Sequence, residues 1–191
     1  KWYDQSSNSN DAVQTNTANM PKIYDGTTGV VTENGKPAVQ FTEQFFSLTS
    51  AITPTEYSAA IVMNPTQLDF ATFGSTVGYT YVTYYRNTND VWFYHGNTGR
   101  VLANSQSTGY QLNWLNWTGS TVGIGKDGGS MITGALSGTP SINQLATSDA
   151  GGSPLRSTGT YQEMIFWATD QDAAGNRTGI ETNINTFYDI F

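Results

Sequence analysis

The sequence predicts an all-β protein, an antiparallel β-sandwich or jelly roll that ends in a short helix. Polar and apolar residues alternate with a period of two through most of the patterned segments, which is typical of strands. Turns rich in Asn and Gly separate these segments at short intervals. Helical spacing of apolar residues occurs only near the C-terminus. Many short strands with almost no helix indicate a sandwich or jelly roll.

The first half of the chain supplies three expected strands. Residues 38–41 form a short one, and residues 57–63 form a largely apolar run that Asn64 and Pro65 stop. A run of this kind indicates a central strand that is buried on both faces. Residues 77–86 alternate, so we expect Val82 and Tyr84 on one face. The other face would carry Tyr79, Tyr81, Thr83 and Tyr85.

The second half is expected to continue as a meander. A turn at 87–90 leads into a strand at 91–94, and a turn at 97–99 leads into a strand at 100–103. Strands follow at 110–117 and 121–125, and the last clear strand is 160–167. Residues 127–153 are rich in Gly, Ser, Thr and Pro, so we expect a loop there, with at most a short strand at 131–132.

Only the end of the chain has a helical pattern. Asn176 is the expected N-cap, and Glu181 lies in the early turns, where a negative charge is favourable. One face of this helix is expected to carry the apolar residues at helical spacing, which are Ile180, Ile184, Phe187 and Phe191.

Length and composition narrow the possible functions. The chain has 191 residues, which predicts one domain. It contains no cysteine, which excludes disulfides, thiolate nucleophiles and cysteine-ligated metal sites. The net charge is −7, so we expect no nucleic-acid partner, because phosphate contacts need Lys and Arg. No apolar run approaches the ~20 residues of a membrane span, so we expect no membrane insertion.

Both ends of the chain resemble a module of tailed-phage structural proteins. Residues 2–12 read WYDQSSNSNDA, followed by MPKI at 20–23 and TENGKPA at 32–38, and the module's pattern is WYDQSGNGNDA, QPKI and ENGKPA. Residues 161–191 resemble its closing strand and helix. The module is similar to concanavalin-A-like (laminin-G-like) jelly rolls and to the catalytic domain of fungal α-L-arabinofuranosidase B. The resemblance implies one jelly-roll domain, 1–191, that lacks upstream residues of a longer protein.

The N-terminal tract differs from the module's pattern at Ser7 and Ser9. Ser9 stands where the family often has Gly, so we expect the loop to avoid a positive backbone angle there. The favoured interpretation of the tract is a compact structural loop, with Asp4 accepting hydrogen bonds from backbone N–H groups. The alternative is a calcium site, for which Asp4, Asn8 and Asp11 are weak candidates. We otherwise expect no cofactor.

Catalysis is not expected. His95 is the single histidine, no GxSxG stretch accompanies it, and a histidine beside a turn is more often structural. Glycoside hydrolysis needs two carboxyl groups. The arabinofuranosidase relatives have a nucleophilic Glu in the middle of the sandwich, and the comparable stretch here, 69–86, has none. Asp149 resembles the acid loop of those enzymes only loosely. The resemblance therefore implies the fold more than the activity, and we assign no catalytic residue.

Carbohydrate binding is better supported by the residue types. Aromatic rings offer flat apolar faces, and amide or carboxylate groups beside them can bond to hydroxyls. The expected binding residues are Trp92, Tyr94, Asn113, Trp114, Trp117 and Asp127. Trp114 and Trp117 should face opposite sides of their strand, one in the core and the other exposed. The competing interpretation is that these aromatics fill the core between the sheets.

Together these observations predict a virion-surface module that binds host-surface carbohydrate. We expect an extracellular location on a tail fibre, tail-associated protein or head decoration, contacts with other virion subunits, and a homo-oligomer whose weak sites add by avidity. Two alternatives stay open: a purely structural module without glycan binding, and a glycosidase of the arabinofuranosidase-like type.

Overall fold

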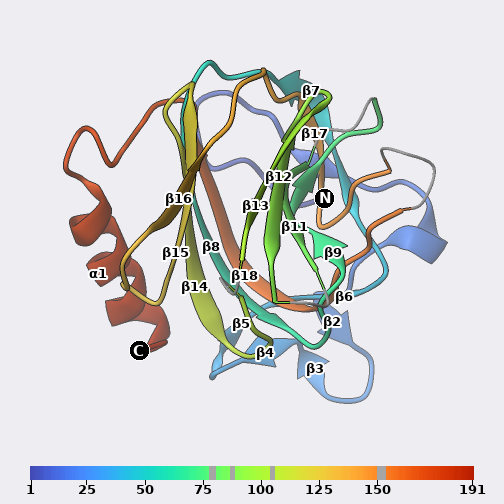
Figure 1. The fold of residues 1–191 in the computed structure, drawn as a ribbon. Coiled ribbons are helices and arrows are strands. Elements are labelled where there is room, and N and C mark those ends of the chain that lie inside the picture. Colours follow the sequence, from blue (N-terminus) through green and yellow to red (C-terminus); the bar gives the residue numbers. More distant parts are fainter. Residues whose placement is uncertain (78–80, 87–88, 104–105, 150–153) are drawn as a thin grey trace.

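The chain folds as a sandwich of two antiparallel sheets with one helix packed outside it (Figure 1). The computed structural model describes residues 1–77, 81–86, 89–103, 106–149 and 154–191. This arrangement confirms the all-β sandwich with a short C-terminal helix. Within the described residues, no helix has the length and apolarity needed to cross a membrane.

The eight-stranded sheet forms one layer. Its order is β1-β7-β17-β10-β11-β12-β13, and β9 also pairs with β11. A two-residue turn joins β12 to β13, and Gly96 supplies the positive φ of 62° that this tight turn requires. The strands are β1 Ala12–Val13, β7 Phe46–Ile52, β9 Phe70–Ala71, β10 Phe73–Gly74, β11 Tyr81–Tyr85, β12 Val91–His95, β13 Thr98–Leu102 and β17 Ile142–Leu145.

The six-stranded sheet forms the other layer, in the order β16-β15-β14-β8-β18-β6. Its strands are β6 Val39–Thr42, β8 Tyr57–Pro65, β14 Gln111–Trp117, β15 Thr121–Lys126, β16 Ile132–Ala135 and β18 Thr158–Trp167. Short elements precede them: β2 Tyr24–Asp25 with β3 Gly29–Val30, β4 Thr32–Glu33 with β5 Lys36–Pro37, and the 3-10 turn η1 Thr17–Asn19. Helix α1, Arg177–Tyr188, lies against the outer face of this sheet.

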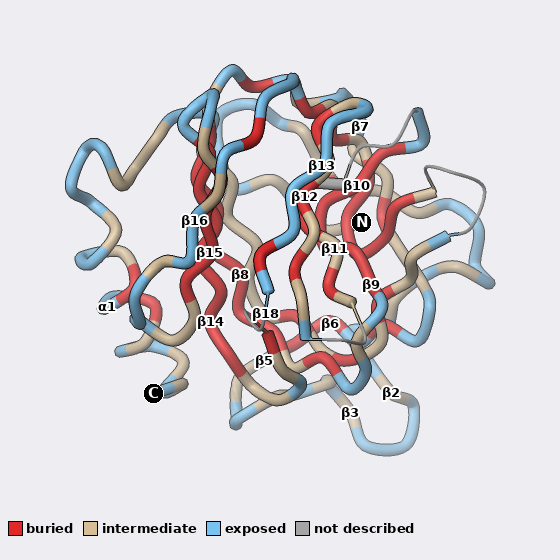
Figure 2. The backbone as a smooth tube through the Cα atoms, in the orientation of Figure 1, coloured by how far each residue is buried: buried red, intermediate tan, exposed pale blue. Residues whose placement is uncertain are grey.

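Two apolar clusters explain why the central strands are buried on both faces (Figure 2). Along β14, Leu115 and Trp117 point between the sheets, whereas Leu112 and Trp114 point toward α1. The same alternation divides β8, since Ile61 belongs to the inner cluster while its neighbours belong to the outer one. The prediction that 57–63 forms a central buried strand is therefore confirmed.

The structure corrects two strand predictions. Residues 142–145 form β17 inside a segment that was expected to be a loop. In β11, Val82 and Tyr85 both pack into the inner cluster, because the pairing of β11 with β12 shifts register between Tyr81 and Tyr84. The bulge breaks the simple alternation predicted for 77–86. The predicted position of Tyr79 lies outside the described residues.

The helix begins where expected, and two of its four predicted packing residues, Ile180 and Ile184, face the sheet. Asn176 has helical backbone angles and makes no side-chain capping bond. Ile180, Ile184 and Tyr188 pack on the six-stranded sheet. Phe187 is 56% exposed, and Phe191 lies beyond the helix end, so the prediction that both share the packed face is wrong. The packed residues recur every four positions, and Phe187 falls about 100° away from Tyr188 on the helix.

Candidate functional site

The residues expected to bind carbohydrate do not meet in one place. Trp92 and Tyr94 lie on the outer face of the eight-stranded sheet, because β12 alternates and sends Val91, Phe93 and His95 inward. The other four predicted residues belong to β14 or to the turn after β15.

Asn113 and Trp117 lie between the sheets. Asn113 Oδ1 accepts a hydrogen bond from Gln106 Nε2 at 3.0 Å, and its Nδ2 donates to Tyr85 Oη at 3.3 Å. Trp117 Nε1 donates to the carbonyl of Leu136 at 3.3 Å. Both side chains are enclosed and have their polar atoms engaged within the protein, so neither is presented to a ligand in this conformation.

Trp114 lies on the outer face of the six-stranded sheet, and Asp127 lies in the turn after β15. Trp114 is fully buried beneath α1, with its ring 5.7 Å from that of Trp167. The expectation that either Trp114 or Trp117 would be exposed is therefore wrong, because the helix covers the face that would otherwise meet water. Asp127 Oδ1 accepts a bond from the backbone N–H of Leu112 at 2.9 Å and so fixes the end of β15.

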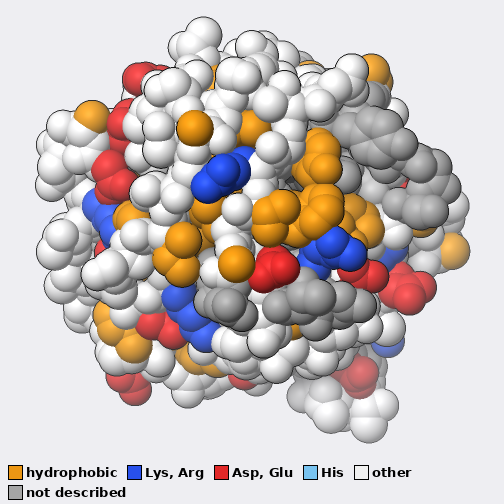
Figure 3. All heavy atoms as spheres, in the orientation of Figure 1, with side chains coloured by type: hydrophobic (Ala, Val, Ile, Leu, Met, Phe, Trp, Pro, Cys, Tyr) orange, Lys and Arg blue, Asp and Glu red, His pale blue; other side chains and the backbone are white. Residues whose placement is uncertain are grey.

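An aromatic cluster on the outer face of the eight-stranded sheet is the first candidate site. We call Tyr84, Arg86, Trp92 and Tyr94 the aromatic face. The rings of Trp92 and Tyr94 stack at 5.8 Å with 22° between their planes, and Tyr84 meets Trp92 edge-on at 6.3 Å. The Arg86 guanidinium carbon lies 4.4 Å from the Trp92 ring centre, within cation–π range. Figure 3 shows hydrophobic side chains gathered over β11 and β12, with a cationic side chain beside them.

Strand pairing builds this cluster. Tyr84 lies opposite Trp92 in the β11–β12 ladder, and Tyr94 lies opposite Gly99 in the β12–β13 ladder. A Cβ added at Gly99 would lie 2.6 Å from Tyr94 Cζ, so the ring rests against bare backbone. The hydroxyl of Tyr84 donates to Asp69 Oδ1. The face thus combines partly exposed aromatic surface with one cation and one carboxylate, which is the chemistry that can hold a sugar ring and its hydroxyls.

Tyr84, Arg86 and Asp69 were absent from the predicted site. Their signal in the sequence is weak, because it depends on the β11–β12 register, and that register contains a bulge.

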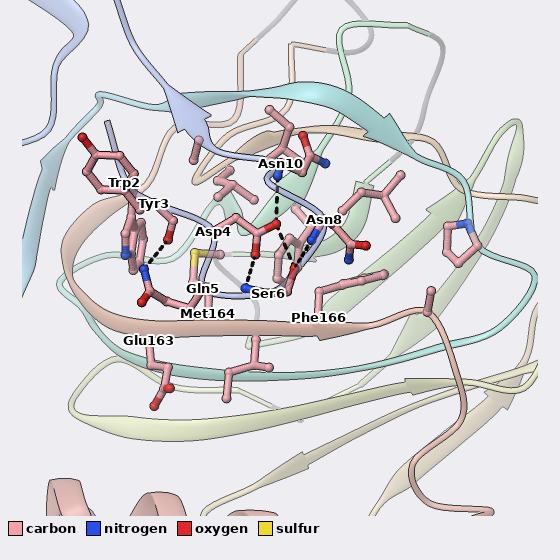
Figure 4. Close-up of a pocket in the computed structure, with 18 of the residues that line it drawn as sticks. Trp2, Tyr3, Asp4, Gln5, Ser6, Asn8, Asn10, Glu163, Met164 and Phe166 are labelled. Atoms are coloured by element: carbon pink, nitrogen blue, oxygen red, sulfur yellow. Dashed lines mark hydrogen bonds between the residues drawn. The ribbon is translucent and has the colours of Figure 1, made fainter.

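A groove beside the N-terminal loop is the second candidate site. Its volume is about 740 Å³, within the range of about 300–1,000 Å³ that is typical of ligand pockets. It is lined by residues of the N-terminal loop at 2–10, by Ala51–Pro54 and by Gln162–Phe166. Met164 points toward the loop, whereas Glu163 points away from it (Figure 4).

The N-terminal loop is held by its own polar side chains. Asp4 accepts hydrogen bonds from the backbone N–H groups of Ser6 and Asn10, each at 2.8 Å, and from Ser6 Oγ at 2.9 Å. The bonds from these backbone N–H groups are the main reason that the pKa of Asp4 lies below its usual value. The expectation that Asp4 holds the loop is confirmed. The expectation for Ser9 is wrong, since its φ is +56°.

Two of the three proposed calcium ligands, Asp4 and Asp11, have their carboxylates bonded within the N-terminal segment. Asp11 accepts from the backbone N–H of Asp4 at 3.0 Å and pairs with Lys1 Nζ at 3.0 Å. Asn8 lines the groove. Among the described residues, no group of three or more His, Asp and Glu side chains is arranged to hold a metal ion.

The titratable residues that were weighed for catalysis have structural surroundings. His95 is buried against Tyr57 and Trp117, and burial lowers its pKa to about 4. Burial also raises the pKa of Glu163, although a hydrogen bond with Tyr188 partly offsets this effect. Asp149 pairs with Arg156 at 2.9 Å and accepts a bond from Gln144.

Comparison with known proteins identifies the fold. No family model and no curated protein matches the chain. Among solved structures, the enzymatically active domain of tailspike protein 2 from bacteriophage CBA120 is similar, with a TM-score of 0.53 and 12% identity over 83% of this chain. The chain spans about 30% of that tailspike chain. A native heptameric SAP-like pentraxin from Limulus polyphemus is similar at a TM-score of 0.47, with 9% identity over 73% of this chain and 79% of the pentraxin chain. At these identities the likeness is one of fold: a β-sandwich that also occurs in a phage tailspike.

Proposed function

We propose that the chain is a virion-surface module that binds host-surface carbohydrate through its aromatic face and acts without catalysis. The observation that carries this proposal is the stacked pair Trp92–Tyr94, partly exposed beside Tyr84 and Arg86. Flat aromatic surface with adjacent hydrogen-bonding groups suits the apolar face and the hydroxyls of a sugar ring.

Three further observations support the proposal. Both ends of the sequence resemble a tailed-phage module, and the fold is one that a phage tailspike uses. The chain is rich in Thr, Ser and Asn and poor in charge, with only 12% charged residues. The carboxylate of Asp4 is occupied by loop hydrogen bonds, and Glu163 points away from the loop that walls the groove, which favours binding over hydrolysis.

The test is the effect of Trp92→Ala on glycan binding. For a glycan identified on an array, calorimetric titration should show that Trp92→Ala weakens binding by roughly fivefold or more, since one stacked ring contributes about 1 kcal/mol or more. Gly99→Ala should weaken binding as well, because its Cβ would displace the Tyr94 ring. Tyr24→Ala removes an aromatic side chain from β2, outside the aromatic face, and is the control; Tyr24 is 63% exposed, more than Trp92. Equal affinity for Trp92→Ala and Tyr24→Ala would rule out the aromatic face as the site.

A structural module without glycan binding is the second candidate function. One observation favours it: β18 carries large apolar side chains that remain partly exposed along an open sheet edge. Such a surface suits assembly with other virion proteins. The two functions are compatible, because the aromatic face and this edge belong to different sheets.

A further inference from the structure

Half of β18 is an open sheet edge. Beside β18, β6 pairs only with Thr158–Tyr161, while β8 pairs with β18 along its other side as far as Trp167. Among the described residues, no second strand pairs with Gln162–Trp167. Strand β6 does not continue along β18, because the residues before it, 32–37, form the separate β4–β5 hairpin. Gln162 Nε2 donates to the carbonyls of Glu33 and Lys36 in that hairpin.

The side chains along this edge are unusually apolar. Met164, Ile165, Phe166 and Trp167 are each only half-buried, whereas neighbouring β8 is almost entirely buried. Open edges are normally protected by Lys, Pro or inward-pointing charges. Between Thr158 and Trp167 there is no Lys, Arg or Pro, and the one charged side chain, Glu163, points away from the N-terminal loop. The edge therefore has the features of a pairing surface.

The groove next to this edge is preformed. Asn10 ties the N-terminal loop to β7 by two bonds with Ser50: Asn10 Nδ2 donates to the Ser50 carbonyl at 2.9 Å, and Asn10 Oδ1 accepts from the Ser50 backbone N–H at 2.8 Å. Together with the bonds to Asp4, these contacts hold the loop alongside β18 (Figure 4).

The lining defines the chemistry of the occupant. We call the apolar lining residues Leu48, Met164 and Phe166 the floor of the groove, and the amides of Gln5, Asn8 and Asn10 its rim. Two carboxylates also line the groove: that of Asp4 is bonded within the loop, and that of Glu163 points away from the loop. Among the described residues that line the groove there is no Lys, Arg or His. A segment of about six residues spans ~20 Å, the length of Gln162–Trp167, and would place alternate side chains against the apolar floor. These features suit an uncharged strand with apolar residues at every second position, and they disfavour anionic ligands.

We propose that this groove and the open edge of β18 accept one extended, uncharged peptide segment of another protein chain, which adds a strand to the six-stranded sheet. Backbone hydrogen bonds to Gln162–Trp167 supply affinity, and the apolar floor selects the alternate side chains. The surface is distinct from the aromatic face and gives the module a means of attachment to a larger assembly.

The test uses a capped peptide of alternating Thr and Val, about six residues long. At millimolar peptide, hydrogen exchange should slow by roughly tenfold or more at backbone amides within Gln162–Trp167. Asn8→Trp fills the groove from its rim and should abolish this protection. Ser7→Trp adds the same bulk to an exposed position of the same loop outside the groove and should leave it intact. A peptide N-methylated at alternate residues, which lacks those backbone donors, should also fail to protect.

Three results would overturn the proposal. The first is the absence of protection at β18 with the unmodified peptide, or equal protection in Asn8→Trp. The second is protection of the same amides by a neutral oligosaccharide and not by the peptide, which would assign the groove to sugar. The third is a concentration-dependent dimer that Asn8→Trp abolishes and the peptide does not disrupt, which would make the occupant a second copy.

Discussion

At the scale of single residues, burial decides the chemistry of His95. Its ring lies 4.6 Å from that of Trp117, and Tyr57 Oη lies 3.2 Å from Nε2. Burial lowers the pKa of His95 to about 4, below the unfolded value of about 6.5. The unfolded chain therefore binds a proton between these two values while the folded protein does not, so stability falls as the pH drops through this window.

This pH dependence can be measured against His95→Gln, which cannot titrate. Between pH 6.5 and 5, the wild type should lose about 2 kcal/mol more unfolding free energy than the variant, because each unit corresponds to about 1.4 kcal/mol. Urea unfolding followed by tryptophan fluorescence gives both curves. If the two proteins lose stability in parallel over this range, His95 is not held neutral by burial.

Ser9 adopts a conformation that costs a side chain energy. A left-handed backbone costs a residue with a Cβ about 1 kcal/mol, and glycine avoids this cost. Ser9→Gly should therefore raise the unfolding free energy by up to about 1 kcal/mol. Ser7→Gly, in the same loop but without a positive φ, should lower it by a few tenths to about 1 kcal/mol. Chemical denaturation of both variants measures these effects, and a destabilised Ser9→Gly would contradict the assigned backbone.

At the scale of elements, α1 is held by one narrow stripe of residues. Ile184 is 5% exposed and packs against the six-stranded sheet. Phe187 is 56% exposed, and its ring centre lies 4.3 Å from Lys36 Nζ. Ile184→Ala should lower the unfolding free energy by about 2–4 kcal/mol, and Phe187→Ala by less than about 1 kcal/mol. Urea titrations of the pair measure the contrast. A larger loss for Phe187→Ala would place the other helix face against the sheet.

The elements that the sequence predicted well are those with an unambiguous pattern. Strand β8 is continuous and apolar because it is covered on both faces, and β12 alternates strictly because one of its faces is solvated. Strand β17 was missed because its four residues include the polar pair Asn143 and Gln144, and its pairing with β7 and β10 depends on distant segments. The bulge in β11 leaves no clear signal in the chain itself.

The candidate site was also predictable only in part, because some of its contacts join residues that are distant in sequence. Trp92 and Tyr94 follow from alternation, and the opposite orientations of Trp114 and Trp117 follow from their odd spacing. Whether an outward-pointing ring meets water depends on what covers it. Helix α1 covers Trp114, and no local pattern around residue 114 reports that contact. The groove likewise joins Asp4 to Met164, which are distant in sequence.

At the scale of the whole molecule, the two sheets offer separate surfaces. The outer face of the eight-stranded sheet carries the aromatic face, and the six-stranded sheet carries α1 on one side and the open edge of β18. In our proposal, one surface binds carbohydrate and the other attaches the module to its assembly. Repeated copies on a particle would then convert weak single sites into firm attachment.

The measurement that most directly tests the central claim is a glycan array probed with the intact protein in multivalent form, with calcium and with a chelator. We predict saturable binding to a defined set of glycans that is unchanged by the chelator, because the acidic groups of the N-terminal loop are already bonded within the loop and to Lys1. Binding that disappears with the chelator would instead assign a metal to that loop. If no glycan on the array retains the protein under either condition, carbohydrate binding is contradicted, and the purely structural role becomes the favoured function.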